Sequence, residues 1–242
     1  MGDGIYVALS GAIAQASSLD ATAANLANAG TDGYQRIRPV FREELSRASA
    51  REPAMHYTAT VDTQTDTTPG ELRVTGNPLD FAMPQGTYLA VTSAGAEQYT
   101  RAASLSIGPD GTLKTSHGPA VVGDDGNTIQ LKGDMSALKI DDTGQLWQGD
   151  EVRARLKLVS FPTPAALQHQ SGSLLVTTPQ SGAPTPSAAK LQMGQIEESN
   201  TSVVGAMTDL VSVSRTFEAF QRVIDTFRDT DRSAVTTVPS VP

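Results

Sequence analysis

Histidines and carboxylates are the residues of this chain that could carry metal or acid–base chemistry. The three histidines, His56, His117 and His169, are scattered, and no HxH or HExxH spacing occurs. In the HxH and HExxH motifs, two closely spaced imidazoles bind one zinc ion. The sequence therefore predicts no histidine metal site.

Two acidic turns bring several side-chain oxygens together. They are Asp124–Asp125–Gly126–Asn127 and Asp141–Asp142–Thr143–Gly144. Calcium loops need alternating oxygen ligands and a terminal glutamate, and both turns lack this pattern. Asp and Asn side chains also favour tight turns by bonding to the backbone two residues on. We therefore expect hairpin turns here and no metal.

Nucleophile and phosphate motifs are missing from the sequence, which contains neither GxSxG nor GxxxxGK[ST]. The carboxylate pairs Glu43–Glu44 and Glu197–Glu198 are sequence neighbours, and adjacent side chains on one element do not face each other. The sequence predicts no catalytic residue and no cofactor, so we expect a protein that is not an enzyme. A periplasmic hydrolase that uses loop carboxylates is kept as an alternative.

Composition narrows the class of protein further. The 242 residues carry a formal net charge of −8 and no cysteine, which disfavours nucleic acid as a partner and excludes disulfides and thiolate metal sites. The first basic residue is Arg36, so no conventional secretory signal is expected. The apolar stretch at 5–14 is too short to span a bilayer, and we expect no membrane insertion.

The N-terminal residues repeat with heptad spacing, which predicts a helix over about 4–29. Asp3 is placed to cap its start, and Gly30 to end it. Alternating spacings of four and three residues define an apolar seam. The seam residues are Ile5, Leu9, Ala12, Ala16, Leu19, Ala23 and Leu26.

The C-terminal residues show the same spacing and predict a second helix over 200–232. Asn200 is expected to cap it, and Pro239 and Pro242 exclude helix in the tail 233–242, which we expect to be flexible. Its seam residues are Val203, Ala206, Leu210, Val213, Phe217, Phe220, Ile224 and Phe227.

The first helix also carries small residues away from its seam, including Ala8, Gly11 and Ala14. Small residues let helix backbones approach closely on several sides. The pattern favours a subunit whose terminal helices pack into a multi-copy, open-ended assembly. Two alternatives are the helix propensity of alanine alone and a closed coiled-coil adaptor.

Between the helices the period falls to two, and turn residues recur about every dozen positions, which predicts short β hairpins. LSIGPDGTL at 105–113 and LKIDDTGQL at 138–146 share one pattern, and each predicts a hairpin. The expected fold is α+β, with the two heptad helices paired as a coiled coil and a central all-β domain. The expected parts are a helix and turn at 1–35, connectors at 36–75 and 183–199, a β domain at 76–182, the helix at 200–232 and the tail.

Four stretches carry a resemblance to a known family. AANLANAGTDGYQR at 23–36 resembles the N-terminal signature of the bacterial flagellar axial proteins, the rod and hook family. TPGELRVTGNPLDFAM at 68–83, QYTRAASLSIGPDGTLKT at 98–115 and the segment 197–224 are similar to three further motifs of that family, in the same order. The residues that carry the signature are Asn25, Leu26, Ala27, Asn28, Thr31, Gly33 and Tyr34, with Tyr34 in place of phenylalanine.

The resemblance implies a structural subunit of the flagellar basal-body rod, whose terminal helices form the hollow shaft that transmits torque to the hook. It implies a proximal-rod member, with a distal-rod member as the alternative. The implied partners are copies of the chain, other rod proteins, the flagellar type III export apparatus and surrounding ring proteins. The implied location is the periplasmic rod, reached without a cleaved signal peptide.

Asn25 and Asn28 share one face of the first helix, outside its seam. Asn28 is close enough to Gly30 to ease the chain into the turn. Asn25 lies too early for that role, and we expect its side chain to bond to a neighbouring helix or to the connector after Gly33.

Overall fold

A computed structural model describes residues 2–45, 56–93, 95–131 and 138–237. The chain divides into two compact units. The helical unit comprises residues 1–26, 38–63 and 203–242, and the β unit comprises residues 27–37 and 64–202. The β unit is therefore inserted, in sequence, between parts of the helical unit.

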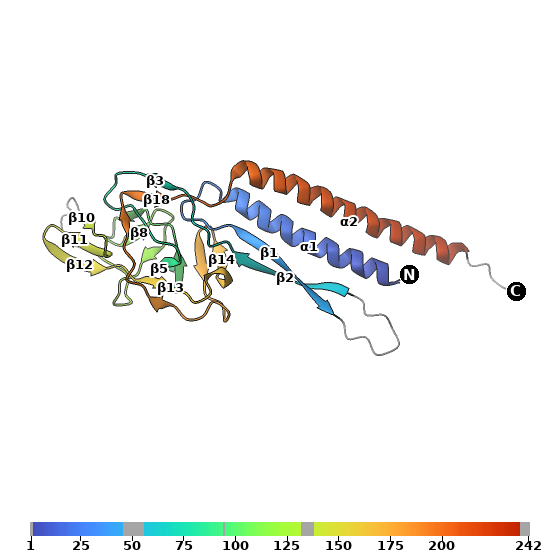
Figure 1. Cartoon of the computed structure of the whole chain (residues 1–242), viewed down its shortest axis with the longest axis horizontal. Coiled ribbons are helices and arrows are strands. Elements are labelled where there is room, and N and C mark those ends of the chain that lie inside the picture. The colour runs from blue at the N-terminus through green and yellow to red at the C-terminus, as the bar shows by residue number, and fades with distance from the viewer. Residues whose placement is uncertain (1, 46–55, 94, 132–137, 238–242) are drawn as a thin grey trace. The chain divides into compact units, whose positions relative to one another are not determined.

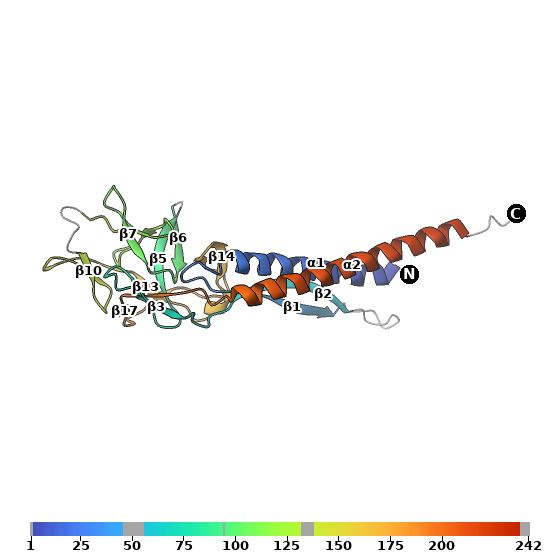
Figure 2. The same cartoon turned by 90° about the horizontal axis from the view of Figure 1, so that it is seen from above.

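The helical unit has two helices and one pair of strands (Figures 1 and 2). They are α1 (Gly2–Ala27), β1 (Ile37–Leu45), β2 (His56–Thr65) and α2 (Val203–Thr237). β1 and β2 pair with each other in a two-stranded sheet within the stretch expected to be an extended connector. Neither helix is both long and apolar enough to cross a membrane, within the part of the chain that the structure describes.

The predicted coiled coil of two heptad helices is wrong. Of the seven seam positions predicted on α1, only Ala12 is buried, whereas Leu9 and Ala23 are exposed. The face that α1 buries is made of small or polar residues. They are Ala8, Ala12, Ala14, Ser18, Ala21 and Asn25. Small side chains, rather than the larger apolar ones at seam positions, decide which face of α1 packs.

Glycine–phenylalanine contacts take the place of matched seams. A Cβ atom added to Gly11 would lie 2.5 Å from the ring of Phe220, and one added to Gly4 would lie 2.9 Å from the ring of Phe227. The order of these contacts makes the helices antiparallel, and Figure 1 shows them alongside each other. Two aromatic rings of α2 therefore rest on bare backbone of α1.

Helix α2 runs beyond its predicted end. Residues 233–237 of the expected tail continue the helix, and residues 238–242 lie outside the described part of the chain. Asn200 does not lie at the start of the helix, which begins at Val203; its side chain has a different role in the β unit. Gly30, expected to end α1, is not among the glycines with positive φ, whereas Gly33 has φ +68°.

The β unit is built from short strands in several sheets. The largest sheet has the strand order β14-β15-β6-β5-β9-β8-β7, and β13 pairs with both β5 and β16 at its side. A second sheet has the order β10-β11-β12. Two further two-stranded sheets are formed by β17 with β4 and by β18 with β3. The strands are β3 (Leu72–Val74), β4 (Phe81–Ala82), β5 (Thr87–Ser93), β6 (Ala96–Thr100), β7 (Leu105–Ile107), β8 (Leu113–Thr115), β9 (Ala120–Val121), β10 (Leu138–Ile140), β11 (Gln145–Gln148), β12 (Glu151–Arg155), β13 (Leu158–Ser160), β14 (Gln168–Ser171), β15 (Leu174–Val176), β16 (Thr185–Pro186), β17 (Gln192–Met193) and β18 (Gln195–Glu197), with a 3-10 helix at Pro164–Ala166.

Strand β5 separates the two hydrophobic clusters of the β unit. Leu89 and Val91 belong to the larger cluster, while Tyr88 and Ala90 belong to the smaller one. Successive side chains of a strand point to opposite faces of the sheet. All four residues are fully buried, so this strand is covered on both faces.

Both hairpins predicted from the internal repeat are confirmed. Ile107 pairs with Leu113 in the first, and Ile140 pairs with Leu146 in the second. The acidic turns also behave as expected: the Asp141 carboxylate accepts bonds from the backbone nitrogens of Thr143 and Gln145, both at 2.9 Å. Partial desolvation acts to raise the pKa of Asp141, but hydrogen bonds from the Thr143 hydroxyl, the Gln145 backbone and the Trp147 indole together hold it below its ordinary value.

Candidate functional site: a buried polar junction

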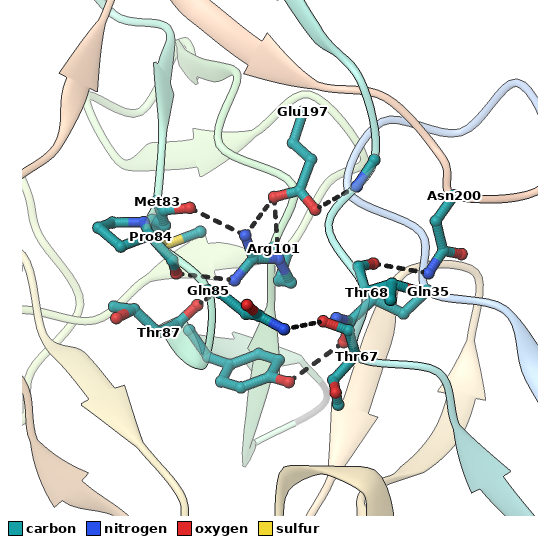
Figure 3. Close-up of polar contacts among 12 residues, drawn as sticks. Gln35, Thr67, Thr68, Met83, Pro84, Gln85, Thr87, Arg101, Glu197 and Asn200 are labelled. Atoms are coloured by element: carbon teal, nitrogen blue, oxygen red, sulfur yellow. Dashed lines mark hydrogen bonds and ion pairs between the residues drawn. The ribbon is translucent and has the colours of Figure 1, made fainter.

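The four stretches that carry the resemblance meet in one buried polar cluster of the β unit (Figure 3). We call it the junction. Its polar contacts join residues from all four stretches: Gly33, Tyr34, Gln35, Arg36, Thr68, Gly70, Met83, Arg101, Glu197 and Asn200. Segments far apart in the sequence are therefore tied together at one place.

Arg101 and Glu197 are the charged centre of the junction, and their side chains are only 1% and 4% exposed. Arg101 donates through Nε and Nη2 to the same oxygen, Oε2 of Glu197. The other guanidinium hydrogens go to the backbone carbonyls of Met83, Pro84 and Thr87 at 2.8 to 3.1 Å. All five N–H groups of the guanidinium are used, which is what a buried arginine requires.

Glu197 reaches two more segments. Its Oε1 accepts from the backbone nitrogen of Gly70 at 3.0 Å, and its backbone carbonyl accepts from that of Gly33 at 2.7 Å. Both carboxylate oxygens are therefore occupied. A Cβ atom added to Gly70 would lie 1.9 Å from the carbonyl oxygen of Glu198, so only glycine fits there.

The side chain of Asn200 does not cap the helix but joins two other segments of the backbone. Its Oδ1 accepts from the backbone nitrogen of Arg36 at 2.7 Å, and its Nδ2 donates to the carbonyls of Asp66 and Thr68. Its backbone nitrogen donates to the carbonyl of Tyr34. The expected capping role is wrong because the amide is saturated by three backbone groups from two other segments.

The loop after α1, residues 28–36, is here called the signature loop. The backbone nitrogen of Thr31 donates to the carbonyl of Asn28 at 3.0 Å, and that of Tyr34 donates to the carbonyl of Thr31 at 3.2 Å. The carbonyl of Asn28 thus opens the first of two consecutive turns, and the role expected of its side chain stays a prediction. The loop ends at Arg36, whose guanidinium pairs with Asp66 at 3.0 Å.

Aromatic side chains bury the middle of the signature loop. The ring of Tyr34 lies 5.0 Å from that of His169, and burial raises the pKa of Tyr34 to about 12. Burial also lowers the pKa of His169, which favours its neutral form. In the same loop, Oε1 of Gln35 accepts a hydrogen bond from the hydroxyl of Tyr88 at 3.2 Å.

The other predicted site residues lie in the helical unit or at the end of α1. Asn25 is 6% exposed and has an interaction partner; Leu26 is half-buried and Ala27 exposed. On α1, Ile5, Ala16 and Leu19 are half-buried. On α2, Ala206 is buried and Val203 exposed, and the remaining seam residues are half-buried: Leu210, Val213, Phe217, Phe220, Ile224 and Phe227. None of these side chains belongs to the junction.

Arg101 and Glu197 were not predicted as a pair. They are 96 residues apart in the chain, and single charged residues are read from sequence as surface groups. A signal did exist, because both lie inside stretches that carry the family resemblance. A buried ion pair with all its hydrogen-bonding groups used, together with two terminal helices that expose apolar side chains, is typical of a structural subunit that packs against neighbours.

Comparison with known proteins supports this class. Residues 5–35 match the family described as flagella basal body rod protein, and residues 192–237 match flagellar basal body rod FlgEFG protein C-terminal. The flagellar basal-body rod protein FlgF of Salmonella typhimurium is 32% identical and that of Escherichia coli K12 33%, covering 93% and 95% of both chains respectively. The rod protein FlgG of Agrobacterium fabrum is 29% identical, over 92% of this chain and 94% of its own.

The chain therefore belongs to the flagellar basal-body rod protein family, and it is a structural subunit of the bacterial flagellar rod. The first matched stretch covers α1 from Ile5 onward and the signature loop as far as Gln35, and the second contains Glu197, Asn200 and all of α2.

Proposed function

We propose that this protein is a proximal-rod subunit that assembles with copies of itself and with other rod proteins through its terminal helices. Relatives of comparable length that carry the FlgF name support the proximal position. A distal-rod role is the second candidate, because relatives named FlgG also match over most of the chain.

Exposed apolar side chains on both helices are the observation that carries the assembly proposal. On α1, Leu9 and Ile13 are 46% and 56% exposed, and on α2, Val204 is 75% exposed. Tyr6 and Val7 on α1, and Met207 and Val211 on α2, are also exposed. Large apolar residues gathered on one element mark an interaction surface.

Parts of the predicted seams belong to this surface. Leu9 on α1 and Val203 on α2 are seam residues that stay exposed in the single chain. The half-buried seam residues of α2 are already partly covered, as the contacts of Phe220 and Phe227 with α1 illustrate. We propose that neighbouring subunits cover the exposed seam residues first.

A non-enzymatic role is part of the proposal. Arg101 and Glu197 form the buried ion pair of the junction, and the five guanidinium N–H groups and both carboxylate oxygens bond to groups of the protein itself. A general acid or base needs a group that can meet a substrate. Export through the flagellar type III apparatus and contact with surrounding rings are proposed from the family alone.

Basal bodies from a strain lacking this gene provide the test. We expect electron microscopy to show rods that stop within the proximal segment, and the wild-type gene supplied in trans to restore full rods. Complete proximal rods that lack only the distal segment would instead favour the distal-rod candidate. Intact rods with a normal hook would overturn both.

A further inference from the structure

The C-terminal segment 195–201 has little secondary structure to hold it in the β unit. Its strand β18 pairs with β3 over three residues, and all three residues of β3 are exposed. Strand pairs this short are marginal without packing on a further element. The buried side chain of Ile196 and the polar side chains of Glu197 and Asn200 add to this attachment.

Glu197 is the residue at which three attachments coincide. One oxygen accepts from Arg101, the other from Gly70, and the backbone carbonyl accepts from Gly33 of the signature loop. Asn200 adds two contacts to the same loop, at Tyr34 and Arg36. The signature loop and the C-terminal segment therefore share partners and are ordered by the same contacts.

We propose that Arg101 and Glu197 form a latch that couples docking of the C-terminal segment to ordering of the signature loop. If the C-terminal segment undocked, the Arg101 guanidinium would keep its three carbonyl partners but lose the Glu197 carboxylate. A buried charge without its counter-charge is strongly unfavourable. Partial docking is thus disfavoured, and both segments become ordered in one step. Helix α1 ends at Ala27, one residue before the loop, and α2 begins at Val203, two residues after the segment.

The latch lies within the β unit, so its test does not depend on the rod function proposed above. Hydrogen exchange of single backbone amides, followed by NMR on the purified full-length protein, measures local opening. The reporters are the nitrogens of Gly33, Arg36 and Gly70, which donate to Glu197 or Asn200. Ala90, which donates to Lys157 across the main sheet, is the internal reference.

Glu197→Gln keeps the shape of the side chain and removes its charge. We expect exchange at all three reporters to accelerate by one common factor of about 10- to 100-fold, the range for losing a hydrogen bond to a charged group, while Ala90 reports how far the whole sheet is destabilised. Glu198→Gln is the matched control, because the carboxylate of Glu198 is next to Glu197 in sequence but pairs with Arg73 at the surface. It should leave all four rates as in the wild type.

Three results would overturn the latch. Acceleration at Gly70 alone would make the contact local, wild-type exchange at the three reporters no faster than at Ala90 would show that the junction opens only when the whole sheet unfolds, and equal effects of both variants would remove any special role for Glu197. Should Glu197→Gln fail to fold, Arg101→Lys keeps the charge with fewer donors and should give the same pattern. Failure of both variants to fold would also count against a latch.

Discussion

Gly33 packs directly against the backbone of Ala102. A Cβ atom on Gly33 would lie 2.2 Å from the nitrogen of Ala102, and Gly33 itself has φ +68°. Two independent constraints, left-handed backbone and missing space, thus fall on one glycine of the family signature. Gly30, three positions earlier, has open space around its Cβ direction and no positive φ.

Gly33→Ala is therefore expected to lower the free energy of unfolding by at least about 2 kcal/mol, from backbone strain together with the clash at Ala102. Urea denaturation followed by circular dichroism measures the change. Gly30→Ala is the matched control and should stay close to the wild type. Equal midpoints for the two variants would show that the approach of Ala102 does not constrain Gly33.

Removing one partner of the buried ion pair should be costly. Glu197→Ala leaves the Arg101 guanidinium buried without its carboxylate, and we expect a loss of about 3–5 kcal/mol in unfolding free energy. Glu198→Ala removes a surface pair with Arg73 and should change stability by less than about 1 kcal/mol. Chemical denaturation of both variants checks the difference, and a loss of similar size in the two would contradict it.

Acid should weaken the packing of the signature loop through His169. Because burial holds the folded pKa of His169 below the ordinary value of 6.5, the unfolded chain binds more protons below that pH. The contribution of His169 is thus fully present above pH 6.5 and is lost as the pH falls towards its folded pKa. Thermal melts between pH 7.5 and about pH 5 should show a shallower pH dependence in His169→Gln than in the wild type; parallel curves would exclude this role.

A charge on the exposed face of α1 should separate assembly from folding. Ile13→Asp changes a side chain that is 56% exposed, so we expect only a small change in the melting temperature but loss of rod incorporation and motility. Asp20→Asn, on an exposed residue of the same helix, is the control and should complement fully. Normal motility with Ile13→Asp would contradict the proposed surface.

Replacing Asn25 should affect assembly more strongly than folding. Its side chain is buried on α1 and has a partner, and we expect Asn25→Ala to weaken assembly more than it weakens the folded monomer. Comparing melting temperature with incorporation into basal bodies measures both. A large loss of monomer stability with normal incorporation would assign Asn25 to folding alone.

The hairpins of the β unit could be predicted because their signals are local. Leu, Ile and a turn glycine recur at fixed offsets in both repeats, and Gly111 and Gly144 take positive φ at matching positions. Turn chemistry of this kind acts within a few residues. The sequence pattern and the structure therefore agree there.

The packing face of α1 could not be predicted in the same way. A heptad search favours Leu9 over Ala14, because it scores larger apolar residues, yet Leu9 is exposed and Ala14 buried. Close approach of a partner helix selects for small side chains instead, as the contact of Gly11 with Phe220 shows. Periodicity found the helix but could not tell which of its faces packs within the chain and which stays exposed.

The helical unit is discontinuous in sequence, with α1 at one end of the chain and its partner α2 at the other. A growing chain presents its N-terminus first, so α1 is complete long before the rings of Phe220 and Phe227 exist to cover it. The β unit can close once residue 202 has appeared, and the helical unit must wait for the last residues of α2. The order of synthesis therefore makes the helices the last part of this subunit to find their packing, and keeps the small-residue face of α1, which α2 later covers, available to other proteins until then.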